Sequence, residues 1–129
     1  MAIKKYYVTV DDMGITRWYK DAKCKVLHRE NGPAVDCTNG HKEWWQYGQR
    51  HRIDGAAIER FDGDKSWWQN GQRHRIDGPA IEYADGCKAW YINGKQMTEA
   101  EFLAATQPAI EMAVADVEKL VGKRVKIIK

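Results

Sequence analysis

Long hydrophobic runs are missing from this sequence. Its 129 residues have a mean hydropathy of −0.68. No stretch approaches the ~20 consecutive apolar residues that a membrane-spanning helix needs. The opening residues, MAIKKYYVTVDDMG, also lack the apolar core of a secretory signal. We therefore expect a protein without a membrane span that acts in the cytoplasm.

Cysteine and proline are scarce as well. The three cysteines, Cys24, Cys37 and Cys87, are odd in number and include no CxxC pair. Without a secretory signal, reduced thiols are expected rather than a disulfide framework. A structural zinc site has little support without paired cysteines. We expect no metal and no cofactor.

Neither sign of charge dominates. Twenty-one Lys and Arg face eighteen Asp and Glu, which gives a net charge of +3. This mild basicity permits a nucleic-acid partner without indicating one. What is abundant is glycine and aromatic residues, with eleven Gly, six Trp and six Tyr. That composition excludes a disordered chain, and the length fits one domain.

A 23-residue repeat dominates the chain. The segments GHKEWWQYGQRHRIDGAAIERFD at 40–62 and GDKSWWQNGQRHRIDGPAIEYAD at 63–85 align without a gap. An earlier unit opens at Gly14 and carries three extra residues around 21–25, and a last unit at 86–97 breaks off halfway. The chain therefore contains three full repeats and a half, which is typical of a repeat architecture.

Aromatic residues and glycines occupy fixed columns of the repeat. One aromatic column contains Trp18, Trp44, Trp67 and Trp90, and the next contains Tyr19, Trp45, Trp68 and Tyr91. A His-Arg-x-[Asn/Asp]-Gly segment follows in each full unit. Turn glycines recur at Gly48, Gly71 and Gly94, two of them as Asn-Gly pairs, which favour tight hairpins.

This spacing predicts a mainly β fold. The segments between glycines are about four to six residues long and rich in Trp, Tyr, Ile and Val, as strands are. We expect an antiparallel β-meander over residues 6–97, with two or three strands per repeat. Alternation puts Trp67 and Trp68 on opposite faces of the sheet. One aromatic column should form the core, and the sequence does not decide which.

The C-terminal residues have a different pattern. Thr98 and Glu101 have the spacing of a helix capping box. Helical spacing continues over 110–122, and apolar residues at 125–128 suggest a short strand. We expect a β-repeat domain over 1–97 and a short α-helical segment with a basic tail over 98–129. That segment either caps the sheet or docks a partner.

The repeat resembles the MORN family. The residues WQNGQRH at 68–74 and YADG at 83–86 are similar to the MORN pattern, which shares the 23-residue period. After the histidine this chain has R-x-[ND]-G-[PA]-A where MORN repeats continue with G-x-G. This HRxDGPA variant, with the ending NGKQMTEAEF, resembles repeats of bacteriophage and bacterial proteins. The resemblance covers roughly residues 14–102. It implies successive hairpins in an elongated sheet that serves as a binding scaffold without catalytic residues.

The His-Arg-x-Asp-Gly segment could supply a base, a cation and a carboxylate. An enzyme needs one such group in a cleft, whereas this one recurs in every repeat. We expect a structural role, with Arg52 or Arg75 paired to its own Asp or to Glu59 or Glu82, and we predict that the chain is not an enzyme. Equivalent histidines should lie roughly 10–14 Å apart across the strands, too far to share a metal ion.

Two kinds of partner remain. Aromatic residues interleaved with arginine, and the basic tail at 119–129, could bind nucleic acid. Carboxylates spread through the repeats would interrupt such a basic track. Trp, Tyr and Arg are also the residues enriched at protein-binding hot spots. We favour a protein partner, a host factor if the chain is of phage type, with homo-oligomers as a further possibility. The candidate binding residues are Trp45, Trp68, Tyr91, Arg52 and Arg75.

Overall fold

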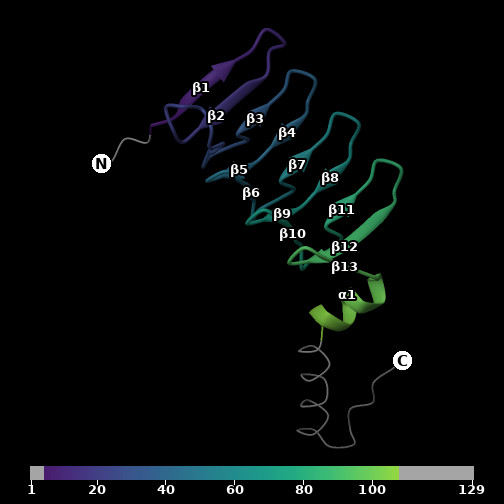
Figure 1. The fold of residues 1–129 in the computed structure, drawn as a ribbon. Coiled ribbons are helices and arrows are strands. Elements are labelled where there is room, and N and C mark those ends of the chain that lie inside the picture. The colour runs from purple at the N-terminus through teal and green to yellow at the C-terminus, as the bar shows by residue number, and fades with distance from the viewer. Residues whose placement is uncertain (1–4, 108–129) are drawn as a thin grey trace, which may run out of the picture. The chain divides into compact units, whose positions relative to one another are not determined.

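The computed structural model describes residues 5–107 (Figure 1). The chain divides into two compact units, Met1–Met97 and Thr98–Lys129. The helical spacing expected over 110–122, the strand expected over 125–128 and the basic tail at 119–129 all lie outside the described residues.

The first unit is built on a nine-stranded antiparallel sheet. The strands follow one another across the sheet almost in chain order, so the meander predicted from the sequence is confirmed. They are β1 (Tyr7–Val10), β2 (Thr16–Tyr19), β3 (Val35–Asp36), β4 (Lys42–Glu43), β7 (Ile58–Glu59), β8 (Lys65–Ser66), β11 (Ile81–Glu82), β12 (Lys88–Ile92) and β13 (Lys95–Met97).

Two small hairpins interrupt the meander. Between β4 and β7 the chain forms β5 (Trp45–Gln46) and β6 (Gln49–Arg50), and between β8 and β11 it forms β9 (Trp68–Gln69) and β10 (Gln72–Arg73). In Figure 1 these hairpins lie at the edge of the sheet opposite the turns that join β3 to β4 and β7 to β8. The strands of the central repeats are two residues long, shorter than expected, because each repeat divides its extended residues between sheet and hairpin. For the same reason each central repeat has four strands, and the expected number of two or three is wrong.

The hairpin turns explain the Asn-Gly pairs. Asn70 and Gly71 have φ of 52° and 80°, and Asn93 and Gly94 have φ of 49° and 81°. Positive φ at both central residues is the type I′ geometry that suits the twist of a two-residue hairpin. The prediction from the Asn-Gly pairs is confirmed. The same turn fixes the register, which places Trp68 opposite Arg73.

Small residues form the core of this unit. The buried apolar side chains come from the strands β3, β7 and β11 and the residues before them: Ala34, Val35, Ala56, Ala57, Ile58, Ala80 and Ile81. All six tryptophans are half-buried. The expectation that one tryptophan column forms the core is therefore wrong. The short side chains are enclosed at the sheet, while each tryptophan stays partly exposed.

The described part of the second unit is helix α1 (Glu99–Thr106). The predicted capping box is present: the Thr98 hydroxyl accepts a hydrogen bond from the Glu101 backbone N–H at 3.1 Å, and the Glu101 carboxylate accepts one from the Thr98 N–H at 2.9 Å. No helix within residues 5–107 is long and apolar enough to cross a membrane.

Candidate functional site

The arginine of each His-Arg-x-Asp-Gly segment ties its own loop together. In the second repeat, Arg52 Nε donates to Asp54 Oδ1 at 3.0 Å, and Arg52 Nη1 donates to the Ala56 carbonyl at 3.0 Å and to Glu59 Oε2 at 3.3 Å. The guanidinium also lies 3.8 Å from the centre of the Trp44 ring. The Arg52 side chain therefore contacts the turn at Asp54, strand β7 at Glu59 and the Trp44 ring.

Arg75 makes the equivalent contacts in the third repeat. Arg75 pairs with Asp77 at 2.8 Å and with Glu82 at 2.9 Å, and it lies 3.8 Å from the centre of the Trp67 ring. A Cβ added to Gly78 would lie 2.9 Å from Arg75 Cζ, which explains the glycine after the Asp. The ion pairs predicted for Arg52 and Arg75 are confirmed.

The histidine of each segment connects one repeat to the next. The Nδ1 atom of His51 accepts the Asn70 backbone N–H at 3.0 Å, and that of His74 accepts the Asn93 N–H at 2.9 Å. His28, which is buried, accepts the Tyr47 N–H at 2.9 Å. Each acceptor reaches the hairpin turn of the following repeat, so the histidine column links neighbouring units.

Two equivalent grooves follow these loops. One has a volume of about 500 Å³ and is lined by Trp44, Arg52 and Ile53 among others. The next, of about 570 Å³, is lined by Ile53, Trp67, Arg75 and Ile76 among others. The two isoleucines are exposed, Ile53 to 78% and Ile76 to 65%. We name this surface the loop face, made of Trp44, Arg52, Ile53, Trp67, Arg75 and Ile76.

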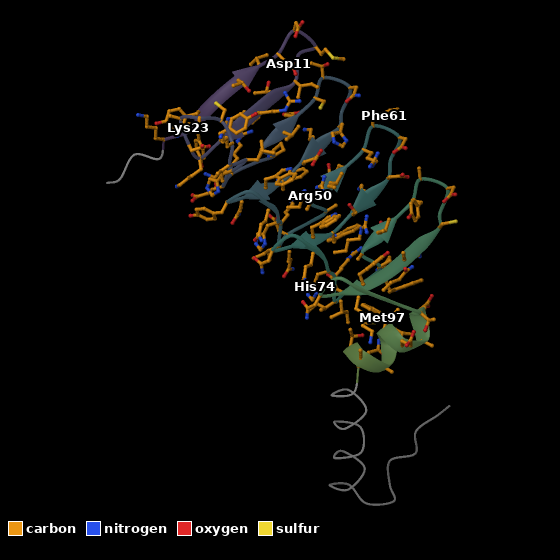
Figure 2. The ribbon with its side chains drawn as sticks, in the orientation of Figure 1. Asp11, Lys23, Arg50, Phe61, His74 and Met97 are labelled. Carbon is orange, nitrogen blue, oxygen red and sulfur yellow. The ribbon has the colours of Figure 1, made fainter. Side chains whose placement is uncertain are left out.

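The second aromatic column lies on the other face of the hairpins. Arg50 Cζ lies 4.9 Å from the centre of the Trp45 ring and 5.1 Å from that of Trp68, and Arg73 Cζ lies 4.8 Å from Trp68 and 5.4 Å from Tyr91. Rings and guanidinium groups therefore alternate from one repeat to the next. We name this row, Trp45, Arg50, Trp68, Arg73 and Tyr91, the ladder. Figure 2 shows Arg50 between neighbouring repeats, with Phe61 at the turn edge of the sheet.

Glu43 of β4 anchors the start of the ladder. Its carboxylate accepts hydrogen bonds from Trp45 Nε1 at 3.0 Å, Arg50 Nε at 3.3 Å and His41 Nε2 at 2.8 Å. Burial raises the pKa of the Glu43 carboxyl, but the hydrogen bonds from His41 and Trp45 and the charge of Arg50 outweigh it. The pKa of Glu43 therefore lies below its ordinary value.

The corresponding position in the third repeat is Ser66, and a cavity of about 270 Å³ lies beside it. Trp68 Nε1 donates to Ser66 Oγ at 2.8 Å. Arg73 Nε is buried and has no hydrogen-bond partner among the described residues. The cavity is lined by Arg50, Ile58, Arg60, Asp64, Lys65, Ser66, Trp68, Arg73, Ile81 and Tyr83.

The structure divides the candidate residues between two surfaces. Trp45, Trp68 and Tyr91 belong to the ladder, whereas Arg52 and Arg75 belong to the loop face. The alternation expected for Trp67 and Trp68 is observed, since these neighbours line different cavities.

Sequence reasoning missed Arg50, and it considered Arg73 only as one of the arginines interleaved with aromatic residues that could contact nucleic acid. The two-residue hairpin turn could have identified both arginines, because it pairs each ladder tryptophan with the residue five positions later. It also missed the exposed isoleucines, which occupy one column of the repeat.

Two of the three cysteines favour the thiol form. Cys24, Cys37 and Cys87 are free thiols. Burial raises the pKa of the Cys37 thiol, and the Asp85 carboxylate raises that of Cys87, so both favour the protonated form over the nucleophilic thiolate. Across residues 5–107, no three His, Cys, Asp or Glu side chains lie close enough together to hold a metal ion.

Comparison with known proteins finds no family model, no curated protein and no solved structure that matches this chain.

Proposed function

We propose that this chain is a non-enzymatic protein-binding module that recognises its partner through the loop face. The observation that carries the proposal is the exposure of Ile53 and Ile76, two large apolar side chains at the same position of successive repeats. Folding gains little from an isoleucine left in water. Contiguous exposed apolar surface beside a groove is typical of interaction sites, and Ile53 and Ile76 contribute such surface to the two grooves of the loop face.

The loop face is rigid enough to bind with little loss of entropy. Arg52 and Arg75 each make three hydrogen bonds within their loops and stack on a tryptophan ring. These contacts hold the backbone of the loop that carries each isoleucine. A preorganised surface avoids part of the ordering cost of association. The two isoleucines therefore present apolar anchors at fixed spacing.

The aromatic faces favour a protein over a nucleic acid. Single-stranded nucleic acids bind by stacking bases on free ring faces. Guanidinium groups flank Trp68 through Arg50 and Arg73, and they also cover Trp44 and Trp67. The charges of Arg52 and Arg75 are paired with carboxylates. On the loop face, an arginine therefore occupies one side of each tryptophan ring, and the charge of that arginine is already paired.

Nucleic-acid binding is the second candidate, and one observation favours it. The cavity beside the ladder is lined by four cationic side chains and a single carboxylate. Filter binding of labelled single-stranded DNA at low and at physiological salt tests this candidate. Retention that falls steeply with salt would support it, because phosphate contacts release counterions. We expect little retention at either concentration.

The nature of the target follows from the resemblance alone. The HRxDGPA repeats resemble those of bacteriophage and bacterial proteins, so we propose a host protein as the partner and inhibition or modulation as the outcome. A host defence system is one such target.

Site-specific photocrosslinking in bacterial lysate tests the loop face. A photoreactive residue is placed at position 53 or 76, and for comparison at position 61. Phe61 is a matched control because it is also a large apolar side chain, 71% exposed, at the turn edge of the sheet. We expect one protein adduct shared by positions 53 and 76 and absent at position 61.

Competition makes this experiment specific. An excess of the unlabelled wild-type chain should suppress the adduct, whereas the Ile53→Ser/Ile76→Ser double variant should not. Equal adducts from positions 53 and 61, or equal competition by the double variant, would contradict the proposal. Adducts that a nuclease removes would transfer support to the nucleic-acid candidate.

A further inference from the structure

We propose that the cavity beside Ser66 binds a carboxylate group, supplied by an Asp or Glu side chain of a protein partner. This inference extends the proposed function, on which it rests for the protein origin of the carboxylate. It concerns the ladder side of the sheet, away from Ile53 and Ile76. Binding there is measured with a peptide, so it can fail or succeed independently of the loop face.

The second repeat shows the chemistry that this position takes. Aligning the two repeats places Glu43 on Ser66, Trp45 on Trp68 and Arg50 on Arg73. In the second repeat, the Glu43 carboxylate receives the indole N–H and the arginine Nε–H. The third repeat keeps both donors but has a hydroxymethyl group where the carboxylate stood. An added carboxylate would complete the same arrangement.

Two hydrogen-bond donors of the third repeat have no acceptor among the described residues. Ser66 Oγ accepts from Trp68 Nε1, which leaves its own hydrogen to donate, and no described residue accepts it. Arg73 Nε has no hydrogen-bond partner among the described residues. A buried donor without an acceptor loses its hydrogen bonds to water without replacement, so an acceptor is favoured there. Ser66 and Arg73 line the same cavity, so one carboxylate there could accept from both side chains once the guanidinium turns toward it.

The charge around the cavity suits an anion. Arg50, Arg60, Lys65 and Arg73 line it, and Arg50 is partly neutralised by Glu43. The only carboxylate in the lining is that of Asp64, whose Oδ1 already accepts the Ala84 N–H at 2.7 Å. Positive charge therefore exceeds negative charge at this point of the sheet.

The size of the cavity favours one side chain over a larger ligand. Its volume of about 270 Å³ falls below the ~300–1,000 Å³ typical of drug-sized ligand sites. Trp68, Ile58 and Ile81 supply apolar lining, and the two isoleucines are buried. An aliphatic stem with a terminal carboxylate matches this combination of apolar wall and cationic rim.

Arginine side-chain NMR on the full-length protein tests the proposal. The Nε–H signal of Arg73 is assigned by its loss in Arg73→Lys and is followed while a blocked peptide, acetyl-Ala-Glu-Glu-Ala-amide, is added. Matched peptides carry glutamine or phosphoserine in place of glutamate. We expect a saturable shift of the Arg73 signal with the glutamate peptide and none with the glutamine peptide.

Two variants exchange the side chains of the two repeats: Ser66→Glu should fill the site in the third repeat, and Glu43→Ser should create one in the second. Ser66→Glu supplies an internal carboxylate and should weaken peptide binding about tenfold or more, as loss of a charge-assisted contact does. Glu43→Ser should make the Arg50 signal responsive to the peptide. If Ser66→Glu fails to fold, Ser66→Ala removes the hydroxyl donor and should also weaken binding.

Three results would overturn the inference. The first is an Arg73 signal that ignores the glutamate peptide. The second is an equal response to the glutamine peptide. The third is tighter binding of the phosphoserine peptide, which would assign the cavity to phosphate. The photocrosslinking result at positions 53 and 76 is independent of all three.

Discussion

At the scale of single residues, the polar groups that recur in this chain perform structural work. Arg52 and Arg75 satisfy carbonyl and carboxylate acceptors within their own loops, and His51 and His74 accept amide hydrogens from the next repeat. A catalytic constellation would occur once. Repetition in every unit instead matches a role that every unit needs.

The histidine contact makes the first prediction. Replacing His74 with Ala removes the acceptor of the Asn93 N–H, and the loss of one hydrogen bond at this exposed turn costs about 0.5–1.5 kcal/mol. Urea denaturation should show that loss in the free energy of unfolding. Ile76→Ser, two residues away and exposed, should change it by less than about 0.5 kcal/mol. Equal stability of His74→Ala and wild type would rule out the link between repeats.

Glu43 makes a pH-dependent prediction. Its pKa in the folded chain lies below the ordinary value of 4.5, so the stability it contributes is complete above that value. It is lost as the pH falls through the lower, folded-state pKa. Glu43→Gln should cost about 1–2 kcal/mol at neutral pH, since three hydrogen bonds to the carboxylate are weakened.

The measurement is denaturant unfolding of wild type and Glu43→Gln over a series of pH values. The difference between them should shrink below about pH 4.5 and vanish in stronger acid. Asp12→Asn, a change at an exposed turn residue, is the control and should show no such trend. A difference that stays constant with pH would show that the Glu43 charge contributes nothing.

At the scale of secondary-structure elements, the hairpin is the unit that sets the register. Both central residues of the β9–β10 turn have positive φ, which glycine and asparagine tolerate. The turn places Trp68 opposite Arg73 and so determines that rings and guanidinium groups alternate along the ladder. The two-residue turn thus also positions Arg73 beside Tyr91 of the next repeat.

The turn gives a third prediction. Gly71 has φ of 80°, and a Cβ there would meet Gln49 only at an ordinary distance of 3.6 Å, so the cost of Gly71→Ala comes from the backbone. Thermal unfolding should show a loss of about 1–2 kcal/mol, the cost of a left-handed residue. Asn70→Gly keeps the turn geometry accessible and should cost less. If Gly71→Ala unfolds at the wild-type temperature, this turn is not type I′.

Much of the architecture could be predicted from the sequence. The period, the antiparallel strands and the Asn-Gly turns follow from local rules, because glycine spacing and positive φ act within a few residues. The core could not be predicted, because both columns are aromatic and alternation says only that they face apart. The ladder depends on how Arg50 of one repeat meets Trp68 of the next, a contact that local spacing does not contain.

The candidate site was only partly accessible for the same reason. Trp45, Trp68 and Arg52 were identified by residue type, which does not show that they lie on different surfaces. Ile53 was overlooked because an exposed isoleucine has no signature until its surroundings are known. The exchange of Glu43 for Ser66 is visible in the aligned repeats, but its consequence for Arg73 appears only in three dimensions.

At the scale of the whole repeat unit, stability is built from contacts between neighbours, as in other repeat proteins. The loops, the histidine links and the ladder use most of the recurring polar and aromatic residues. The exposed isoleucines Ile53 and Ile76 remain without a structural task. The central claim is that Arg52 and Arg75 hold the fold, while the adjacent Ile53 and Ile76 serve recognition.

Thermal unfolding of two double variants tests that claim most directly, because they change adjacent residues of the same loops. Arg52→Ala/Arg75→Ala should lower the unfolding midpoint by about 10 °C or more, since each loss of 1 kcal/mol is worth about 4–8 °C in a domain of this size. Ile53→Ser/Ile76→Ser should leave the midpoint within about 2 °C of wild type. An equal fall in both variants would make the isoleucines structural and contradict the account.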